Sequence, residues 1–134
     1  MTGWRLGYVI APREIIRAMQ KIHQNFFISA NAFVQWAGVA ALTQCQDEVE
    51  RMRQTYAARR LFLLDGLKGL GFQIPRAPTG AFYVLVNARD YSTDSLSFAF
   101  DLLRTAGVAV APGIDFGGNA EGYMRFSYAT AHAR

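Results

Sequence analysis

Two arginines, each in an apolar segment that reads as a strand, are the residues of this sequence best suited to hold an anion. Arg5 lies in an otherwise uncharged run, residues 4–11, that is typical of a fully buried strand. A guanidinium keeps its proton, so its burial requires a fixed anion. Two sources of that anion stay open. One is a ligand phosphate, which suits the planar fork of arginine, and the other is a carboxylate from a distant part of the fold.

Arg125 stands among apolar and aromatic residues in the segment 123–128. Composition alone favours an arginine of an edge strand that faces water. A bidentate anchor for a carboxylate is the alternative, because the guanidinium fork matches two carboxylate oxygens.

Other polar and aromatic residues have a structural role that explains them equally well. Asn31 and Ser29 lie at the start of a predicted helix, where either can cap the helix or face a binding site. Phe116 can line a pocket for a substrate, as can Phe82 and Tyr83, although aromatic residues more often pack in a core.

Histidines, cysteine and lysines form no recognisable catalytic set. His23 and His132 have no partner at a catalytic spacing and read as surface residues. The single Cys45 cannot form an internal disulfide, and the sequence has no Cys/His cluster typical of zinc. Lys21 and Lys68 lie inside predicted helices. We therefore predict no metal site, and the cysteine content fits a reducing compartment such as the cytoplasm.

Composition limits the classes of protein to which the sequence can belong. Hydrophobic residues make up 51% of it and aromatic residues 13%, which indicates a folded core. The net charge is +4, but the basic residues are spread out and mix with acidic ones over residues 47–65, as on a solvated helix face. No apolar run reaches the roughly 20 residues that cross a bilayer. We expect no nucleic-acid or membrane partner.

Residues 1–45 are predicted to form a strand and two helices. Pro12 follows the strand at residues 4–11 and suits the first position of a helix of about four turns. Apolar residues recur in that helix at helical spacing: Ile15, Met19, Ile22 and Phe26. A second helix begins near Asn31.

Residues 46–134 are predicted to follow the order helix, strand, strand, helix, strand, strand. The long helix covers about residues 47–67, and Gly69 or Gly71 ends it. Its predicted buried stripe consists of Val49, Met52, Tyr56, Leu63 and Leu67. The strands are expected over residues 72–75, 81–88, 108–111 and 123–129. This order predicts an α+β fold, a small, mostly antiparallel sheet with helices on one side.

The helix between the second and third of these strands has its own start and stop signals. Ser92 or Thr93 is the expected cap, and Gly107 is the expected end. Its predicted buried face carries Leu96, Ala99, Leu103 and Ala106.

Five motifs occur in an order that resembles a known family. They are Met1-Thr2-Gly3-Trp4-Arg5-Leu6-Gly7-Tyr8 with Ala11-Pro12; Gln24-Asn25 and Ser29-Ala30-Asn31 through Gln35; Gly80-Ala81-Phe82-Tyr83; Pro112-Gly113 with Phe116-Gly117; and Arg125-Phe126-Ser127-Tyr128-Ala129. Together they resemble class I/II aminotransferases, which are fold type I, pyridoxal-phosphate-dependent enzymes. The first motif resembles the segment just after the Schiff-base lysine.

The resemblance implies a domain layout and roles for particular residues. Residues 1–45 would be the end of the large cofactor-binding domain of an α/β three-layer parent. Residues 46–134 would be the C-terminal small domain without its last helix. Arg5 matches the arginine that grips the cofactor's phosphate, and Arg125 matches the one that holds the α-carboxylate of the substrate. Asn31 and Phe116 fall in substrate-binding regions.

The resemblance also implies an activity. The parent would transfer an amino group from an aspartate-, aromatic- or alanine-like amino acid to a 2-oxo acid in biosynthetic amino acid metabolism, as a cytoplasmic homodimer. Neither Lys21 nor Lys68 stands in the setting of the Schiff-base lysine, so the isolated chain is expected to be inactive. The alternative is a stand-alone α+β module, derived from that family, that binds a ligand or a protein.

Overall fold

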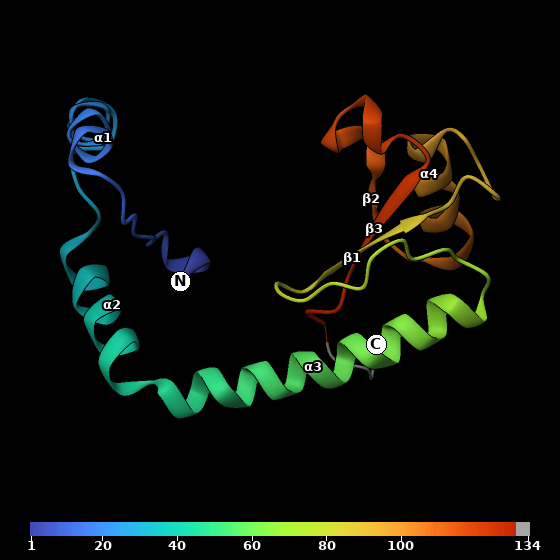
Figure 1. Cartoon of the computed structure of the whole chain (residues 1–134), viewed down its shortest axis with the longest axis horizontal. Coiled ribbons are helices and arrows are strands. Elements are labelled where there is room, and N and C mark those ends of the chain that lie inside the picture. Colours follow the sequence, from blue (N-terminus) through green and yellow to red (C-terminus); the bar gives the residue numbers. More distant parts are fainter. Residues whose placement is uncertain (131–134) are drawn as a thin grey trace. The chain divides into compact units, whose positions relative to one another are not determined.

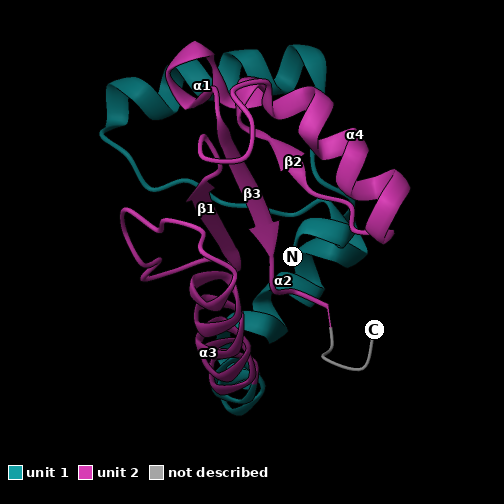
Figure 2. Cartoon of the chain, turned by 90° about the vertical axis from the view of Figure 1, so that its right-hand side faces the viewer, with its two compact units in different colours: residues 1–51 teal, residues 52–134 magenta. Residues whose placement is uncertain are grey.

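A computed structural model describes residues 1–130 of the chain. The contacts divide the chain into two compact units, residues 1–51 and the residues from Met52 onward, coloured separately in Figure 2. His132 and the edge of a further helix, which the sequence suggests at residues 131–134, lie outside the described residues.

The first unit is helical. A 3₁₀ turn at Thr2–Trp4 is followed by helices α1 (Arg13–Phe26) and α2 (Ala32–Gln44) and by the start of α3 (Gln46–Gly69) (Figure 1). Helix α1 begins directly after Pro12, with Glu14 in its first turn, where the helix dipole favours a negative charge. Asn31 occupies the N-cap position of α2. Both helices expected in residues 1–45 are confirmed.

The strand expected over residues 4–11 is absent, and this prediction was wrong. Residues 5–11 form no helix or strand, and the Trp4 and Tyr8 side chains are 60% and 74% exposed. A strand needs a neighbour to pair with its backbone N–H and C=O groups, and residues 1–51 contain no strand. The apolar run indicates a segment suited to burial, but it does not specify a pairing partner.

The second unit contains a three-stranded antiparallel sheet. Its strands are β1 (Tyr83–Asn87), β2 (Ala111–Pro112) and β3 (Tyr123–Ser127), in the spatial order β1-β3-β2. Helix α4 (Ser95–Ala106) packs beside β2 and β3, as Figure 2 shows. The α+β fold expected from the sequence is confirmed.

The two faces of this sheet differ in character. One face buries Val84, Val86 and Met124 against Leu64 and Leu67 of α3, together with Ala99 of α4. Because side chains alternate along a strand, the residues directly before and after each of these three in the sequence belong to the opposite face. They include Tyr83, Leu85 and Arg125, none of which is buried.

The buried stripes of the helices differ from the prediction in detail. On α3, Leu67 is buried, but Val49 and Met52 are 49% and 50% exposed, so only the C-terminal half of the expected stripe packs on the sheet. On α4 the buried face is turned by one residue. It contains Ser95, Phe98, Ala99 and Leu102, whereas Leu96 and Leu103 are each 47% exposed.

The ends of these helices show which of the candidate residues cap them. Gly71, with φ +91°, ends α3 in a Schellman motif, in which the Phe72 N–H donates to the Leu67 carbonyl. Gly107 ends α4 as predicted. The N-cap of α4 is Asp94, however, and not Ser92 or Thr93, because its carboxylate accepts a hydrogen bond from the Ser97 N–H at 3.0 Å.

Two of the expected strands are shorter than predicted. Residues 72–75 contribute only a single bridge, Gln73 to Asn87, and Pro75 has no N–H with which to extend it. The strand expected over residues 108–111 is reduced to Ala111–Pro112. The sheet is therefore small, and β3 is its only strand with a partner on both sides among the described residues.

The turn after β2 depends on close backbone packing at Gly113. A Cβ atom there would lie 1.9 Å from the carbonyl oxygen of Ala120 and 2.7 Å from that of Tyr123. Gly113→Ala is expected to lower the free energy of unfolding by about 1–3 kcal/mol, because a backbone oxygen cannot rotate away. Urea unfolding measures the change.

Gly118→Ala is the matched control, since a Cβ at Gly118 would meet nothing within 4 Å. Equal unfolding free energies for the two variants would contradict the packing described for Gly113.

Candidate functional site

Arg125 lies at the middle of the sheet. It is the third residue of β3, opposite Leu85 of β1 on one side and Ala111 of β2 on the other. Its half-buried side chain belongs to the face that the helices leave open. The central strand therefore fixes the backbone of this arginine through both neighbouring strands.

Two aromatic rings hold the Arg125 guanidinium. Its central carbon lies 4.2 Å from the centroid of the Tyr83 ring and 4.8 Å from that of the Phe116 ring. Such cation–π contacts each stabilise the arrangement by about 0.5–2 kcal/mol. Within residues 1–130, no ion pair or hydrogen bond engages this guanidinium. The rings hold the guanidinium without using the N–H donors at its edge, which can therefore receive an anion.

The Arg125 guanidinium lies in a hollow of about 470 Å³. Residues 76–80 form one wall, and Tyr83, Leu85 and Phe116 line the rest. The lining includes a second cation, Arg76, and no carboxylate. Apolar walls around a fixed cation suit a small molecule that combines a carboxylate with an apolar part.

A hydrogen-bond network positions the turn that carries Phe116. It ends a 3₁₀ turn, η2 (Gly113–Phe116), in which the Ile114 N–H donates to the Ser95 Oγ at 3.2 Å. Ser95 is 1% exposed, and its N–H donates to the Glu121 Oε1 at 2.7 Å. The same oxygen accepts the Gly122 N–H at 3.0 Å. This network, Ser95–Glu121, ties the start of α4 to the turn that carries Phe116.

The hydrogen bonds of the Ser95–Glu121 network stabilise the ionised carboxylate. The backbone N–H of Ser95 makes the largest contribution to lowering the pKa of Glu121 below its ordinary value of 4.5; the Ser95 side chain and the Gly122 N–H add to it. The charged form of Glu121 therefore holds the network together at neutral pH.

Arg5 and Asn31 line a second hollow, within the first unit, of about 710 Å³. Arg5 is exposed and has φ +56°, a left-handed conformation at the end of the first 3₁₀ turn. The neighbouring Trp4 ring meets the Phe33 ring of α2 edge-on, with centroids 6.3 Å apart. This contact fixes the segment that carries Arg5 against α2.

The structure therefore brings some of the sequence-predicted site residues together. Arg125 and Phe116 share one hollow, and Arg5 and Asn31 share another with Ser29. Asn31 makes no side-chain capping bond, so its N-cap position does not use its amide. The expectation that Arg5 is buried in a strand was wrong, because its segment is exposed and unpaired.

Sequence reasoning missed several residues that shape these hollows. His23 lies exposed on α1, as the sequence predicted, but its place in the lining of the Arg5 hollow and the contact of its ring with that of Phe27, at 5.9 Å, were not foreseen. Ser95 and Glu121 were not singled out. They lie 26 positions apart, and no periodic pattern signals a hydrogen bond over such a separation.

The sequence matches a family model described as "Aminotransferase class I and II" over residues 1–134. It is 44% identical to the aspartate/prephenate aminotransferase of Thermus thermophilus, with 98% of this chain and 34% of the relative covered. It is 41% identical to an aspartate aminotransferase of Pyrococcus horikoshii, with the same two coverages. The chain thus spans about a third of the length of these curated relatives.

Solved structures give the same result. An aspartate aminotransferase mutant of Thermus thermophilus superimposes with a TM-score of 0.87 and 43% identity, over 98% of this chain and 36% of that one. An aromatic aminotransferase from Pyrococcus horikoshii has a TM-score of 0.89 and 41% identity, over 99% of this chain and 36% of that one.

The lowered pKa of Glu121 predicts a pH dependence of stability. Because the pKa is lower in the folded than in the unfolded state, the carboxylate stabilises the fold fully above about pH 4.5 and loses this effect as the pH falls through the folded-state pKa. Glu121→Gln is therefore expected to be less stable than the parent at neutral pH, and the difference should shrink in acid. Urea unfolding at a series of pH values measures it.

Asp101→Asn serves as the control, since Asp101 is an exposed residue whose nearest cation, Arg104, is 3.8 Å away. It should change the pH profile of stability little. A constant stability difference between Glu121→Gln and the parent at all pH values would contradict the assignment.

Proposed function

Because this chain belongs to the class I and II aminotransferase family, we propose that it is a portion of a larger pyridoxal-phosphate-dependent aminotransferase and provides two of its anion anchors. The observation that carries the proposal is the Arg125 guanidinium, which contacts the Tyr83 and Phe116 rings and has no carboxylate partner among the described residues. The enzyme would transfer an amino group from an amino acid to a 2-oxo acid.

In this proposal Arg125 binds the α-carboxylate common to both substrates. The guanidinium fork donates two parallel hydrogen bonds to the two oxygens, which fixes the direction of the carboxylate. A fixed carboxylate holds the neighbouring carbon in one orientation, and such positioning lowers the entropic part of the barrier. The cation–π contacts with the Tyr83 and Phe116 rings restrict the rotation of the fork.

The hollow that contains Arg5 fits the phosphate of the cofactor. Arg5 supplies a charged, bidentate donor, and within residues 1–130 no ion pair or side-chain hydrogen bond occupies it. Ser29 and Asn31 add polar groups at the start of α2, where an anion is favoured. When bound, pyridoxal phosphate supplies the electron sink for bond changes at the α-carbon. Neither Lys21 nor Lys68 lines this hollow, so the lysine that bonds the cofactor is assigned to another part of the enzyme.

The proposed substrates are an amino acid of the aspartate, aromatic or alanine-like kind and a 2-oxo acid. Support comes from the names of the relatives, which include aspartate/prephenate, aspartate and valine–pyruvate aminotransferases. The apolar lining of the Arg125 hollow suits the carbon skeleton of each of these substrates. The process would be biosynthetic amino acid metabolism.

We further propose that residues 1–45 belong to the large domain of a homodimer and residues 46–134 to its small domain. The exposed apolar stripe of α1 supports a partner on that helix, since Ile15, Ile22 and Phe26 are 52%, 58% and 76% exposed. No helix of the described residues is long and apolar enough to cross a bilayer. A cytoplasmic location is proposed from the single free Cys45.

Arg125→Gln in the full-length enzyme is expected to raise the KM for the amino acid and lower kcat/KM, because the substrate carboxylate loses its charged partner. The cost is about 2–5 kcal/mol of transition-state stabilisation. Steady-state kinetics measures it, and absorbance of the bound cofactor shows that the enzyme remains loaded.

Arg104→Gln is the matched control, since Arg104 also lies over a ring, Phe100 at 5.6 Å, but outside the Arg125 hollow. Normal kcat/KM in the Arg125 variant would refute the proposed role.

Arg5→Gln is expected to weaken retention of pyridoxal phosphate by a factor of about ten or more, the loss expected for a charge-assisted hydrogen bond. Dialysis followed by cofactor quantification measures the dissociation constant. Arg13→Gln removes an exposed charge at the start of α1 and should change retention little. Equal retention by the two variants would remove Arg5 from the phosphate site.

A further inference from the structure

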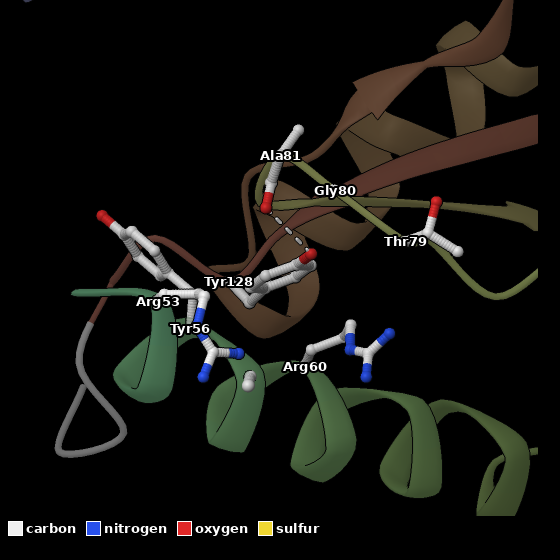
Figure 3. A pocket seen from close by; sticks show the side chains of 8 residues that line it. Arg53, Tyr56, Arg60, Thr79, Gly80, Ala81 and Tyr128 are labelled. Carbon is white, nitrogen blue, oxygen red and sulfur yellow. Dashed lines mark hydrogen bonds between the residues drawn. The ribbon is translucent and has the colours of Figure 1, made fainter. Parts of the chain in front are cut away.

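One wall of the Arg125 hollow is also the wall of a separate hollow. Thr79 and Gly80 line both, and the second hollow, of about 300 Å³, lies between this wall and α3 (Figure 3). Residues 78–81 are here called the shared wall. The Arg125 hollow lies on one side of this wall, and α3 lies on the other. Arg60 and Tyr128 line the α3 side.

Two side chains hold the shared wall from the α3 side. The Arg60 Nη1 donates to the Pro78 carbonyl at 2.7 Å, and the Tyr128 hydroxyl donates to the Ala81 carbonyl at 3.2 Å, the dashed line in Figure 3. The backbone N–H of Tyr128 donates to the Phe82 carbonyl at 3.0 Å. The carbonyls of Pro78, Ala81 and Phe82 are thus hydrogen-bonded either to α3 or to Tyr128, the residue that follows β3.

The shared wall requires such ties because its backbone is strained. Ala81 has φ +57°, a conformation disfavoured for a residue with a side chain. A strained backbone persists only where the surroundings over-determine it. Tyr128 is 5% exposed, and burial raises the pKa of its phenol, which therefore stays protonated as a donor to Ala81.

The position of the wall affects the Arg125 site directly. Tyr83, whose ring lies 4.2 Å from the Arg125 guanidinium, follows Ala81 by two residues. A shift of the wall therefore moves that ring and the side of the hollow together. The Arg60 Nη1 and the Tyr128 hydroxyl each donate to a carbonyl of the shared wall, which supports a clamp on this wall.

We propose that Arg60 and Tyr128 are positioning residues that set the affinity of Arg125 for a carboxylate by clamping the shared wall. This inference rests on the proposed function, because it takes Arg125 to be the carboxylate anchor. Neither residue touches the substrate; they act through the wall and the Tyr83 ring.

The test uses the full-length enzyme and benzoate, an aromatic carboxylate that has no amino group to react. Isothermal titration gives the dissociation constant of benzoate at a temperature well below the melting temperature of every variant, so that loss of stability does not enter. Arg60→Gln and Tyr128→Phe are each expected to raise this constant about fivefold, the factor that corresponds to one hydrogen bond. Arg60→Lys keeps a charged donor and should restore part of the affinity.

Arg59→Gln is the matched control. Arg59 is the neighbouring arginine on α3 and also donates to a backbone carbonyl, that of Ala129 at 2.6 Å, but this carbonyl is outside the shared wall. It should leave the dissociation constant unchanged. Tyr128→Phe keeps the buried ring and decides the matter if Arg60→Gln does not fold.

Arg125→Gln separates the two proposals. If it weakens benzoate binding while Arg60→Gln and Tyr128→Phe bind benzoate as the parent does, the clamp is refuted and the proposed function stands. A normal benzoate affinity in Arg125→Gln would overturn the carboxylate anchor, and the clamp with it. Equal weakening by Arg59→Gln would show a general charge effect and would also refute the clamp.

Discussion

The arrangement of the second unit around Arg125 follows from one constraint. A guanidinium cannot lose its proton, and this one has no anionic partner among the described residues. Arg125 lies on the central strand, its guanidinium contacts two aromatic rings, and no carboxylate among the described residues pairs with it. The rings compensate for part of the lost hydration of its faces, but they do not supply the two acceptors that its edge can bind. In the proposed function an incoming carboxylate would supply them, and this arginine would then be an anchor rather than part of a structural ion pair.

The rest of the unit places the two rings. Tyr83 comes from the start of β1 and Phe116 from the turn after β2, so the two rings come from the chain segments that flank β3 on either side. Each ring is positioned by a separate set of hydrogen bonds. The Ser95–Glu121 network holds the turn that carries Phe116, and the shared wall, which precedes Tyr83 in the sequence, is held by Arg60 and Tyr128. Both supports use hydrogen bonds to backbone groups, which suits a site that must keep its geometry before the substrate arrives.

The sequence predicted the helices and the antiparallel sheet, because helical spacing and glycine caps are local signals. It named Arg125 and Phe116 as separate candidate site residues, but it did not predict that they are in contact. It did not predict that residues 4–11 lack strand structure, since pairing depends on neighbours that hydrophobicity does not specify. It also placed the cap of α4 at Ser92 or Thr93, where a carboxylate at Asp94 does the capping. Glu121 and Tyr128 gave no signal of their roles, because each binds a backbone group far away in the sequence, that of Ser95 and that of Ala81.

The role of Arg125 as a carboxylate anchor is tested by a crystal structure of the full-length enzyme with bound benzoate. We expect the two carboxylate oxygens side by side at the edge of the Arg125 guanidinium, about 2.7–2.9 Å from its nitrogens. We also expect the Tyr83 and Phe116 rings to remain in contact with the guanidinium. A carboxylate bound elsewhere, with Arg125 paired to an acidic residue of the protein, would refute the role of Arg125 as the carboxylate anchor.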